Sequence, residues 1–116
     1  MRQIMIGDII AVARSVLGQQ SADRASTVQA LLDHAHIADK VMKRLGRPHP
    51  LWGNGSLLAA CAAHPKPPEP FAGDLAYLEA MRDTIAQVMC WKRAAGELHS
   101  RHRDGNHCRK QWTMTR

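Results

Sequence analysis

Residues 21–46, SADRASTVQALLDHAHIADKVMKRLG, place an apolar side chain at every third or fourth position along their whole length. This period is typical of an amphipathic helix with one buried stripe. Ser21 is a favourable N-cap, and Gly46 supplies the left-handed residue that often follows a helix. The pattern therefore predicts a helix over residues 22–45. The apolar stripe consists of Ala25, Val28, Leu31, Leu32, Ala35, Ala38, Met42 and Leu45.

The composition of the whole chain agrees with a helical protein. The 116 residues include 17 Ala, whereas aromatic residues make up only 4%. Alanine favours helices, and strands prefer aromatic and β-branched side chains. A chain of this length provides one hydrophobic core. These observations exclude an all-β protein and a large enzyme domain with an enclosed active site.

Three further segments have helical patterns, at about residues 8–17, 57–63 and 75–95, and we expect Asp8, Ser56 and Asp74 to cap them. The sequence thus predicts a small all-α domain of four helices within residues 1–95. We expect the long and last helices to pack antiparallel, with the short helix between them. The last helix is expected to bury its large apolar side chains, namely Leu75, Leu78, Met81, Ile85, Val88 and Met89.

The loop between the long and short helices has the most unusual composition in the chain. Its two prolines and two glycines exclude regular structure across residues 47–55. Because tryptophan is favoured at binding hot spots, the loop is our leading candidate for a protein-binding surface. Packing of the indole between the two helices is the alternative, and it is the commoner role of a tryptophan in a chain with few aromatic residues. The candidate partner-binding residues are Arg47, His49, Trp52 and Asn54.

The positive charge of the chain is concentrated after residue 91. The net charge is +6, of which residues 92–116 contribute seven basic and two acidic groups. We expect residues 96–116 to form a disordered basic tail, and non-specific nucleic-acid binding is the alternative function. The candidate nucleic-acid-binding residues are Lys92, Arg93, Arg101, Arg103, Arg109 and Lys110. The spacing of the histidines and the cysteine in the tail matches no zinc motif, so no metal site is expected.

No arrangement of residues matches the requirements of catalysis. The serines lack the context of a nucleophile elbow, and nothing in the sequence orients His64 toward Cys61. We therefore expect a protein that is not an enzyme and needs no cofactor. Three widely spaced cysteines and the lack of a signal peptide or an apolar span predict a cytoplasmic protein without membrane contact.

Residues 45–58, LGRPHPLWGNGSLL, resemble the central motif of a family of short uncharacterised alphaproteobacterial proteins. The resemblance extends to the start of the chain and to the Pro-Glu-Pro-Phe segment at 68–71, and it covers about residues 1–93. The family is a domain of unknown function. The resemblance therefore implies a domain extent and a source class, and it implies no activity.

Overall fold

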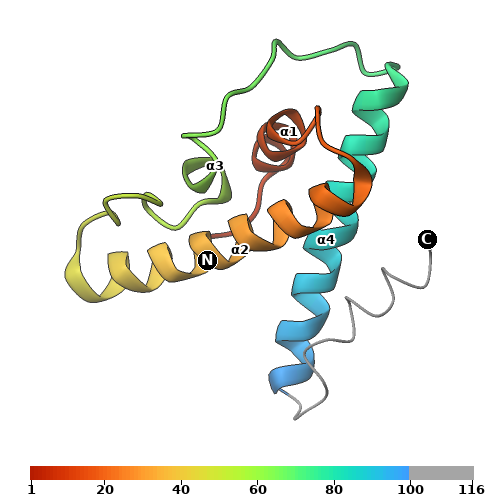
Figure 1. Cartoon of the computed structure of the whole chain (residues 1–116). Coiled ribbons are helices and arrows are strands. Elements are labelled where there is room, and N and C mark those ends of the chain that lie inside the picture. The colour runs from red at the N-terminus through yellow and green to blue at the C-terminus, as the bar shows by residue number, and fades with distance from the viewer. Residues whose placement is uncertain (100–116) are drawn as a thin grey trace.

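The computed structural model describes the backbone of residues 1–99 and the side chains of residues 1–96. Residues 1–99 form four helices: α1 (Ile6–Ser15), α2 (Ser21–Leu45), α3 (Leu57–Ala60) and α4 (Leu75–His99), as Figure 1 shows. Within residues 1–99 there is no strand beyond one isolated bridge. The predicted all-α class is confirmed. From residue 100 on, the expected tail lies outside the described residues.

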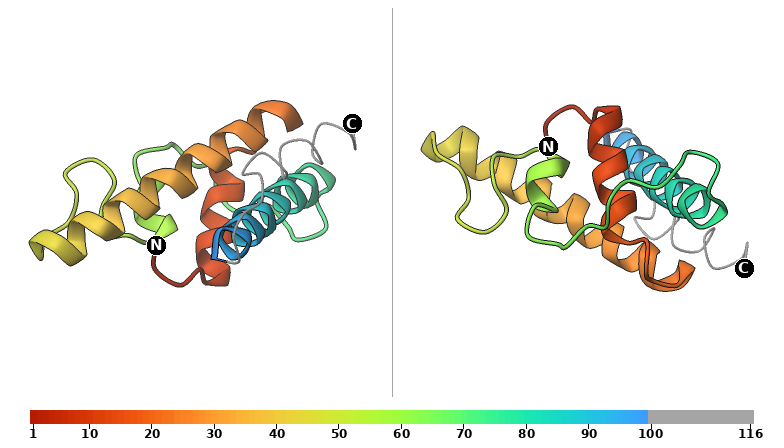
Figure 2. Two further views of the ribbon diagram at one scale, coloured as in Figure 1. Left: turned by 90° about the horizontal axis from the view of Figure 1, so that it is seen from below. Right: turned by 90° about the horizontal axis from the view of Figure 1, so that it is seen from above.

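The helices pack around α1, which lies between α3 and α4 (Figure 2). Helix α3 contacts α1 and α2, whereas α4 contacts α1 and α2 from the other side. The expected antiparallel packing of α2 and α4 is wrong. Both helices run from right to left in the two views of Figure 2, and in Figure 1 α4 runs downward across the leftward course of α2, so the two cross obliquely. Helix α1 rather than α3 fills the space beside their crossing.

The core consists mainly of small and medium side chains. Val12, Val16 and Val28 are fully buried, and so are Leu31 and Leu32 on the predicted stripe of α2. Alanines from α1, α2 and α4 fill the space between them, which lets the helix backbones approach closely. The apolar stripe of α2 was therefore predicted correctly as far as Ala38, and Leu45 at its end is exposed.

The ends of the helices follow the local sequence in most cases. Gly46 adopts the expected left-handed conformation with φ of 73°. The Ser56 side chain accepts a hydrogen bond from the amide of Ala59, and Asp74 does the same for Tyr77. These three predictions are confirmed, although α3 is shorter than residues 57–63 and α4 continues beyond residue 95.

Two predicted N-caps are wrong, Asp8 and Ser21. Helix α1 begins at Ile6, and Asp8 lies buried in its first turn, where it accepts hydrogen bonds from the amides of Met5 and Leu58. One carboxylate therefore accepts a backbone amide at the start of α1 and another at the start of α3. Ser21 is already helical, and its hydroxyl donates to the carboxylate of Asp83 instead.

The predicted buried face of α4 is also wrong. Leu75, Leu78, Ile85 and Met89 are exposed by 69, 48, 38 and 45%, respectively. Of the predicted set only Met81 and Val88 pack partly against the core. The side chains that α4 buries are small or polar, namely Tyr77, Ala80, Asp83, Thr84, Gln87 and Cys90.

A buried ion pair accounts for this rotation of α4. The Asp83 carboxylate lies 3.0 Å from the Arg24 guanidinium on α2, and neither side chain is appreciably exposed. Arg24 also donates to the carbonyl oxygens of Val16 and Leu17 at the end of α1. Because a buried guanidinium without a counter-ion is strongly unfavourable, Arg24 favours the orientation of α4 that turns Asp83 inward, and in that orientation the large apolar side chains of α4 face outward.

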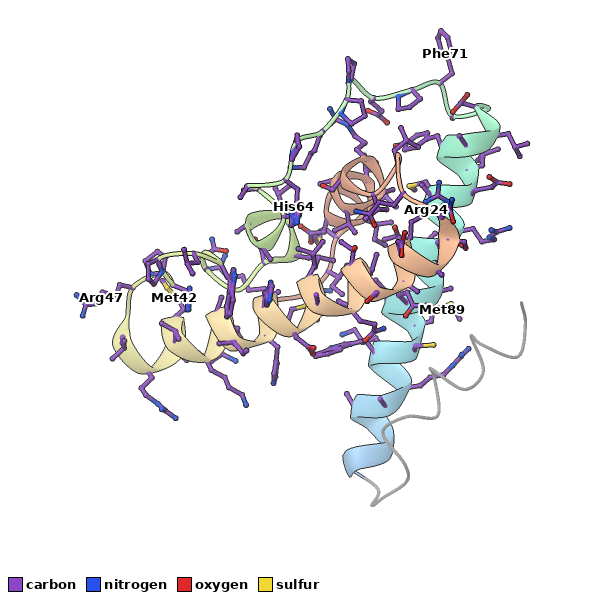
Figure 3. The ribbon with its side chains drawn as sticks, in the orientation of Figure 1. Arg24, Met42, Arg47, His64, Phe71 and Met89 are labelled. Carbon is purple, nitrogen blue, oxygen red and sulfur yellow. The ribbon has the colours of Figure 1, made fainter. Side chains whose placement is uncertain are left out.

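The segment between α3 and α4 is extended, as its four prolines require. Beyond Cys61, which belongs to the core, side-chain hydrogen bonds attach it to the body. The Arg14 guanidinium donates twice to the carbonyl oxygen of Pro67, and the Tyr77 hydroxyl donates to Glu69. Lys66 donates to the carbonyl oxygens of Cys61 and His64 after α3. Phe71, at the far end, points away from the body and is 90% exposed (Figure 3).

Candidate functional site

The loop of residues 46–56 folds back on itself through backbone hydrogen bonds. The amide of His49 donates to the carbonyl oxygen of Gly53 over 2.8 Å, and the amide of Gly53 donates in return over 3.1 Å. The Nδ1 atom of His49 accepts from the amides of Leu51 and Trp52. His49 therefore acts as an internal acceptor that shapes the turn, because an Nδ1 that receives two amides carries no proton of its own.

Trp52 is half-buried between two imidazole rings. Its indole lies parallel to the ring of His34 on α2, with ring centroids 4.0 Å apart, and to the ring of His49, with centroids 4.5 Å apart. The interplanar angles of 3° and 6° describe flat stacking on both faces of the indole. The stack attaches the loop to α2, and only the edges of the indole remain open to another molecule.

Two glycines bring the loop backbone against its neighbours. Gly53 and Gly55 have φ angles of 83° and 103°, which side chains rarely tolerate. A Cβ on Gly53 would lie 2.5 Å from the Cβ of Ala59, and one on Gly55 would lie 2.8 Å from the Cα of Asp39. The carbonyl oxygen of Gly55 also accepts the amide of Arg2. The loop thus joins α2, α3 and the N-terminal segment.

The four predicted partner-binding residues do not form one surface. His49 and Trp52 contact each other, and the Asn54 side chain accepts the amide of Ser56 within the loop. Arg47 is exposed and projects away from the body at the end of α2 (Figure 3). His34, the partner of Trp52, was not singled out in the sequence, because a histidine in a helix carries no local mark of a ring contact from a distant loop.

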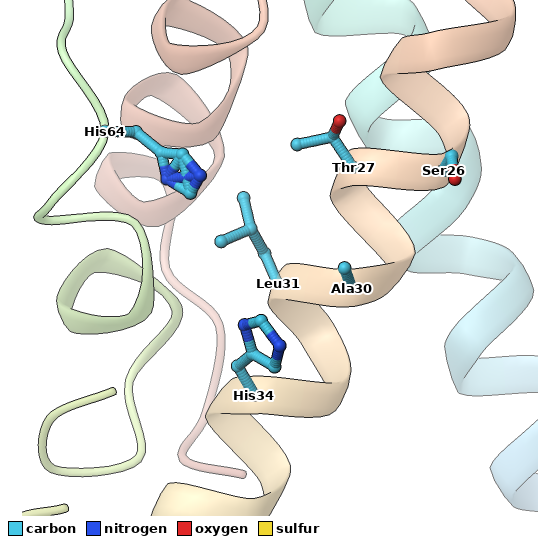
Figure 4. A pocket seen from close by; sticks show the side chains of 6 residues that line it. All are labelled: Ser26, Thr27, Ala30, Leu31, His34 and His64. Carbon is cyan, nitrogen blue, oxygen red and sulfur yellow. The ribbon is translucent and has the colours of Figure 1, made fainter. Parts of the chain in front are cut away.

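A pocket of about 310 Å³ lies between α2 and the segment that follows α3 (Figure 4). Its floor is Leu31, and its walls include Ser26, Thr27, His34 and His64. The Nδ1 atom of His64 is buried and has no hydrogen-bond partner. The pocket can offer a ligand two imidazoles and a hydroxyl. Within the part of the chain that the structure describes, no group of three or more side chains is placed to hold a metal ion.

The thiol beside this region is poorly suited to attack a substrate. Burial raises the pKa of Cys61, and the nearby ammonium of Lys66 opposes this shift only in part. Because the thiolate is the nucleophilic form, a raised pKa lowers the reactivity of this cysteine. Its Sγ donates to the carbonyl oxygen of Leu58 within α3. Cys61 is therefore a core residue.

Among the described residues, α4 carries more exposed large apolar side chains than any other helix. We define the outer face of α4 as Leu75, Leu78, Ile85 and Met89, which recur at helical spacing on the side opposite Asp83. Met89 points away from α2 in Figure 3. Exposed apolar side chains that are contiguous on a monomer commonly mark an interaction site.

Of the six predicted nucleic-acid-binding residues, two belong to the described part of the chain. Lys92 and Arg93 are exposed on α4, three and four residues after Met89. Arg101, Arg103, Arg109 and Lys110 lie outside the described residues.

Comparisons with known proteins give a family and nothing more specific. The model of a family described as a domain of unknown function, DUF7742, matches residues 2–89. No curated protein and no solved structure matches the chain. Among the described residues, no helix combines the length and the apolar character that crossing a membrane requires.

Proposed function

The chain belongs to the DUF7742 family, a domain of unknown function, and on this premise we propose that it is a non-enzymatic protein-interaction module that binds its partner with the outer face of α4. The fold holds this helix in place through α1 and α2 and leaves its large apolar side chains in solvent. A rigid helix that presents an apolar face is a common way to bind another protein.

The single observation that supports this proposal is the orientation of α4. The helix buries Asp83 and Thr84 and exposes Leu78 and Ile85, which reverses the usual distribution of polar and apolar side chains. Large exposed apolar side chains on one helix face are unfavourable in water unless a second surface covers them. A binding partner would provide that cover.

The loop of residues 46–56 offers less to a partner. Both faces of Trp52 are already stacked on imidazoles, and His49 and Asn54 use their acceptors within the loop. Hot-spot residues act by inserting a large side chain into a partner pocket, which the stack prevents without rearrangement. This contrast favours α4 over the loop as the binding surface.

Site-specific photo-crosslinking tests the proposal in cells that produce the full chain at its native level. A benzophenone side chain is placed at Leu78 on the outer face of α4, at Leu51 in the loop and at Ala22 on the exposed side of α2. We expect a protein adduct from position 78 and none from position 22. An adduct from position 51 with none from position 78 would move the surface to the loop and overturn the proposal.

A further inference from the structure

We propose that the partner of the outer face of α4 is the same face of a second copy of this chain, paired antiparallel about a twofold axis near Ile85. This inference rests on the function proposed above and names its partner. The four residues of the face are separated by three, seven and four positions, so they follow one line along α4. Such a line is the seam along which two helices pack side by side.

The charges at the two ends of the seam select the second copy and its direction. Asp74 and Glu79 lie at the start of α4, whereas Lys92 and Arg93 lie toward its end. Lys92 comes seven residues after Ile85, and Leu78 comes seven residues before it. Antiparallel pairing about Ile85 therefore places Lys92 and Arg93 opposite positions 78 and 77 of the second copy, which lie between its Asp74 and Glu79 carboxylates.

Other arrangements lack this complementarity. A parallel pair would place the carboxylates of both copies at one end and the cations of both copies at the other, and like charges repel. A twofold antiparallel pair instead forms the same favourable contacts twice, as an isologous interface requires. The charges at the two ends of the seam are thus complementary when one copy is reversed.

Arg82, which lies between Leu78 and Ile85 on the seam, does not oppose the pairing. Its guanidinium contacts the Asp83 carboxylate of its own chain at 3.2 Å. The charge is therefore partly balanced within the monomer, and the aliphatic stem remains available to cover the neighbouring apolar side chains. Since only about four turns of one helix contribute on each side, we expect a dimer that dissociates on dilution.

The first test measures the mass of the full chain by sedimentation equilibrium from micromolar to millimolar concentration. We expect the average mass to rise from 12.9 kDa toward twice that value. Ile85→Asp should weaken self-association at least tenfold. Ile37→Asp is the matched control, since Ile37 on α2 is exposed to a similar extent, 43% against 38%, and should leave self-association unchanged. A wild-type mass that stays at one chain, or equal effects of both variants, would overturn the inference.

The second test uses charge reversal to establish direction. Glu79→Lys in one chain and the pair Lys92→Glu with Arg93→Glu in another should each weaken the homodimer, whereas an equimolar mixture should form heterodimers. Failure of the mixture to associate would overturn the antiparallel arrangement. The crosslinking experiment separates the two proposals: an adduct of Leu78 with a different protein overturns self-pairing alone, and the absence of any adduct overturns both.

Discussion

The indole of Trp52 lies flat against the imidazole of His34, with ring centroids 4.0 Å apart and ring planes 3° from parallel. This contact joins the loop of residues 46–56 to α2, and no side-chain hydrogen bond of Trp52 contributes to it. Stacked aromatic pairs are stabilising beyond the area that they bury. The stack is therefore a structural attachment, and its removal should affect stability directly.

Trp52→Ala should lower the free energy of unfolding by about 2–3 kcal/mol, because a half-buried indole with two stacked neighbours is lost. Leu51→Ala, at a neighbouring side chain that is 73% exposed, should change it by about 0.5 kcal/mol or less. Urea denaturation followed by circular dichroism measures both variants. Equal, small losses in the two variants would show that the stack does not hold the loop.

Replacement of the buried carboxylate of α4 should have a larger effect. Asp83→Asn leaves the buried guanidinium of Arg24 without its counter-ion, so we expect a loss of about 3–5 kcal/mol. Arg82→Ala removes the other cation near Asp83, but Arg82 is 66% exposed and should contribute about 1 kcal/mol or less. Thermal and urea unfolding would distinguish the two, and a similar loss in both would contradict the role given to Arg24.

The helix α4 was predicted correctly, but the prediction of its buried face failed for a reason that no local pattern contains. The large apolar residues of this helix lie on one face, and that periodicity indicated burial. The position of Asp83 opposite Arg24, which lies 59 residues earlier in the chain, determines instead which face turns inward. Long-range ion pairs of this kind have no mark in the spacing of apolar residues.

Predictions of helix ends succeeded where the end depends only on residues next to it in the sequence. Gly46, Ser56 and Asp74 end or begin helices as expected, because each acts within three residues of its own position. Asp8 is the third helical residue rather than the N-cap, because its carboxylate accepts the amide of Met5 and the helix therefore begins earlier. Its second hydrogen bond, from the amide of Leu58, requires the folded arrangement of α1 and α3. Among the candidate site residues, Trp52 was recognised from the unusual composition of its loop. Its contact with His34 could not be predicted, because it depends on how the loop packs on α2.

The glycines of the loop differ in what surrounds them, which allows a matched comparison. Gly55→Ala places a Cβ 2.8 Å from the Cα of Asp39 at a φ of 103°, so backbone must move and we expect a loss of about 2 kcal/mol or more. Gly46→Ala meets open space at a φ of 73° and should lose about 1 kcal/mol. Urea midpoints rank the two variants, and a greater loss at Gly46 would exclude the close contact.

Stability should decrease in two steps as the pH falls. Burial, and then the α-amino group of Met1, lowers the pKa of His36 from 6.5, and hydrogen bonds from that amino group and from Lys43 lower the pKa of Asp39 from 3.8. In both cases the unfolded chain takes up the proton more readily than the folded chain. The stability that each group contributes is therefore complete above its unfolded pKa and is lost as the pH falls below that value.

His36→Gln should accordingly flatten the decline of the urea midpoint below about pH 6.5, and Asp39→Asn should flatten the decline below about pH 3.8. The remaining acidic residues are common to the wild type and both variants, so differences between the curves report on His36 and Asp39 together with the Met1 amino group that both contact. A wild-type midpoint that increases between neutral and mildly acidic pH would contradict the direction of the His36 shift.

Non-specific nucleic-acid binding by the basic segment after residue 91 makes a quantitative prediction about salt. Neutralising Arg101, Arg103, Arg109 and Lys110 to glutamine in the full chain removes four cations that would otherwise displace counter-ions from phosphates. The slope of the logarithm of affinity against the logarithm of salt concentration should then become shallower by about 3 to 4 for duplex DNA. Fluorescence anisotropy with two unrelated DNA sequences measures this slope, and equal slopes on both sequences are expected of binding that reads no bases.

A scrambled tail of the same composition is the control and should bind as the wild type does. An unchanged slope after neutralisation would show that these four residues do not bind nucleic acid.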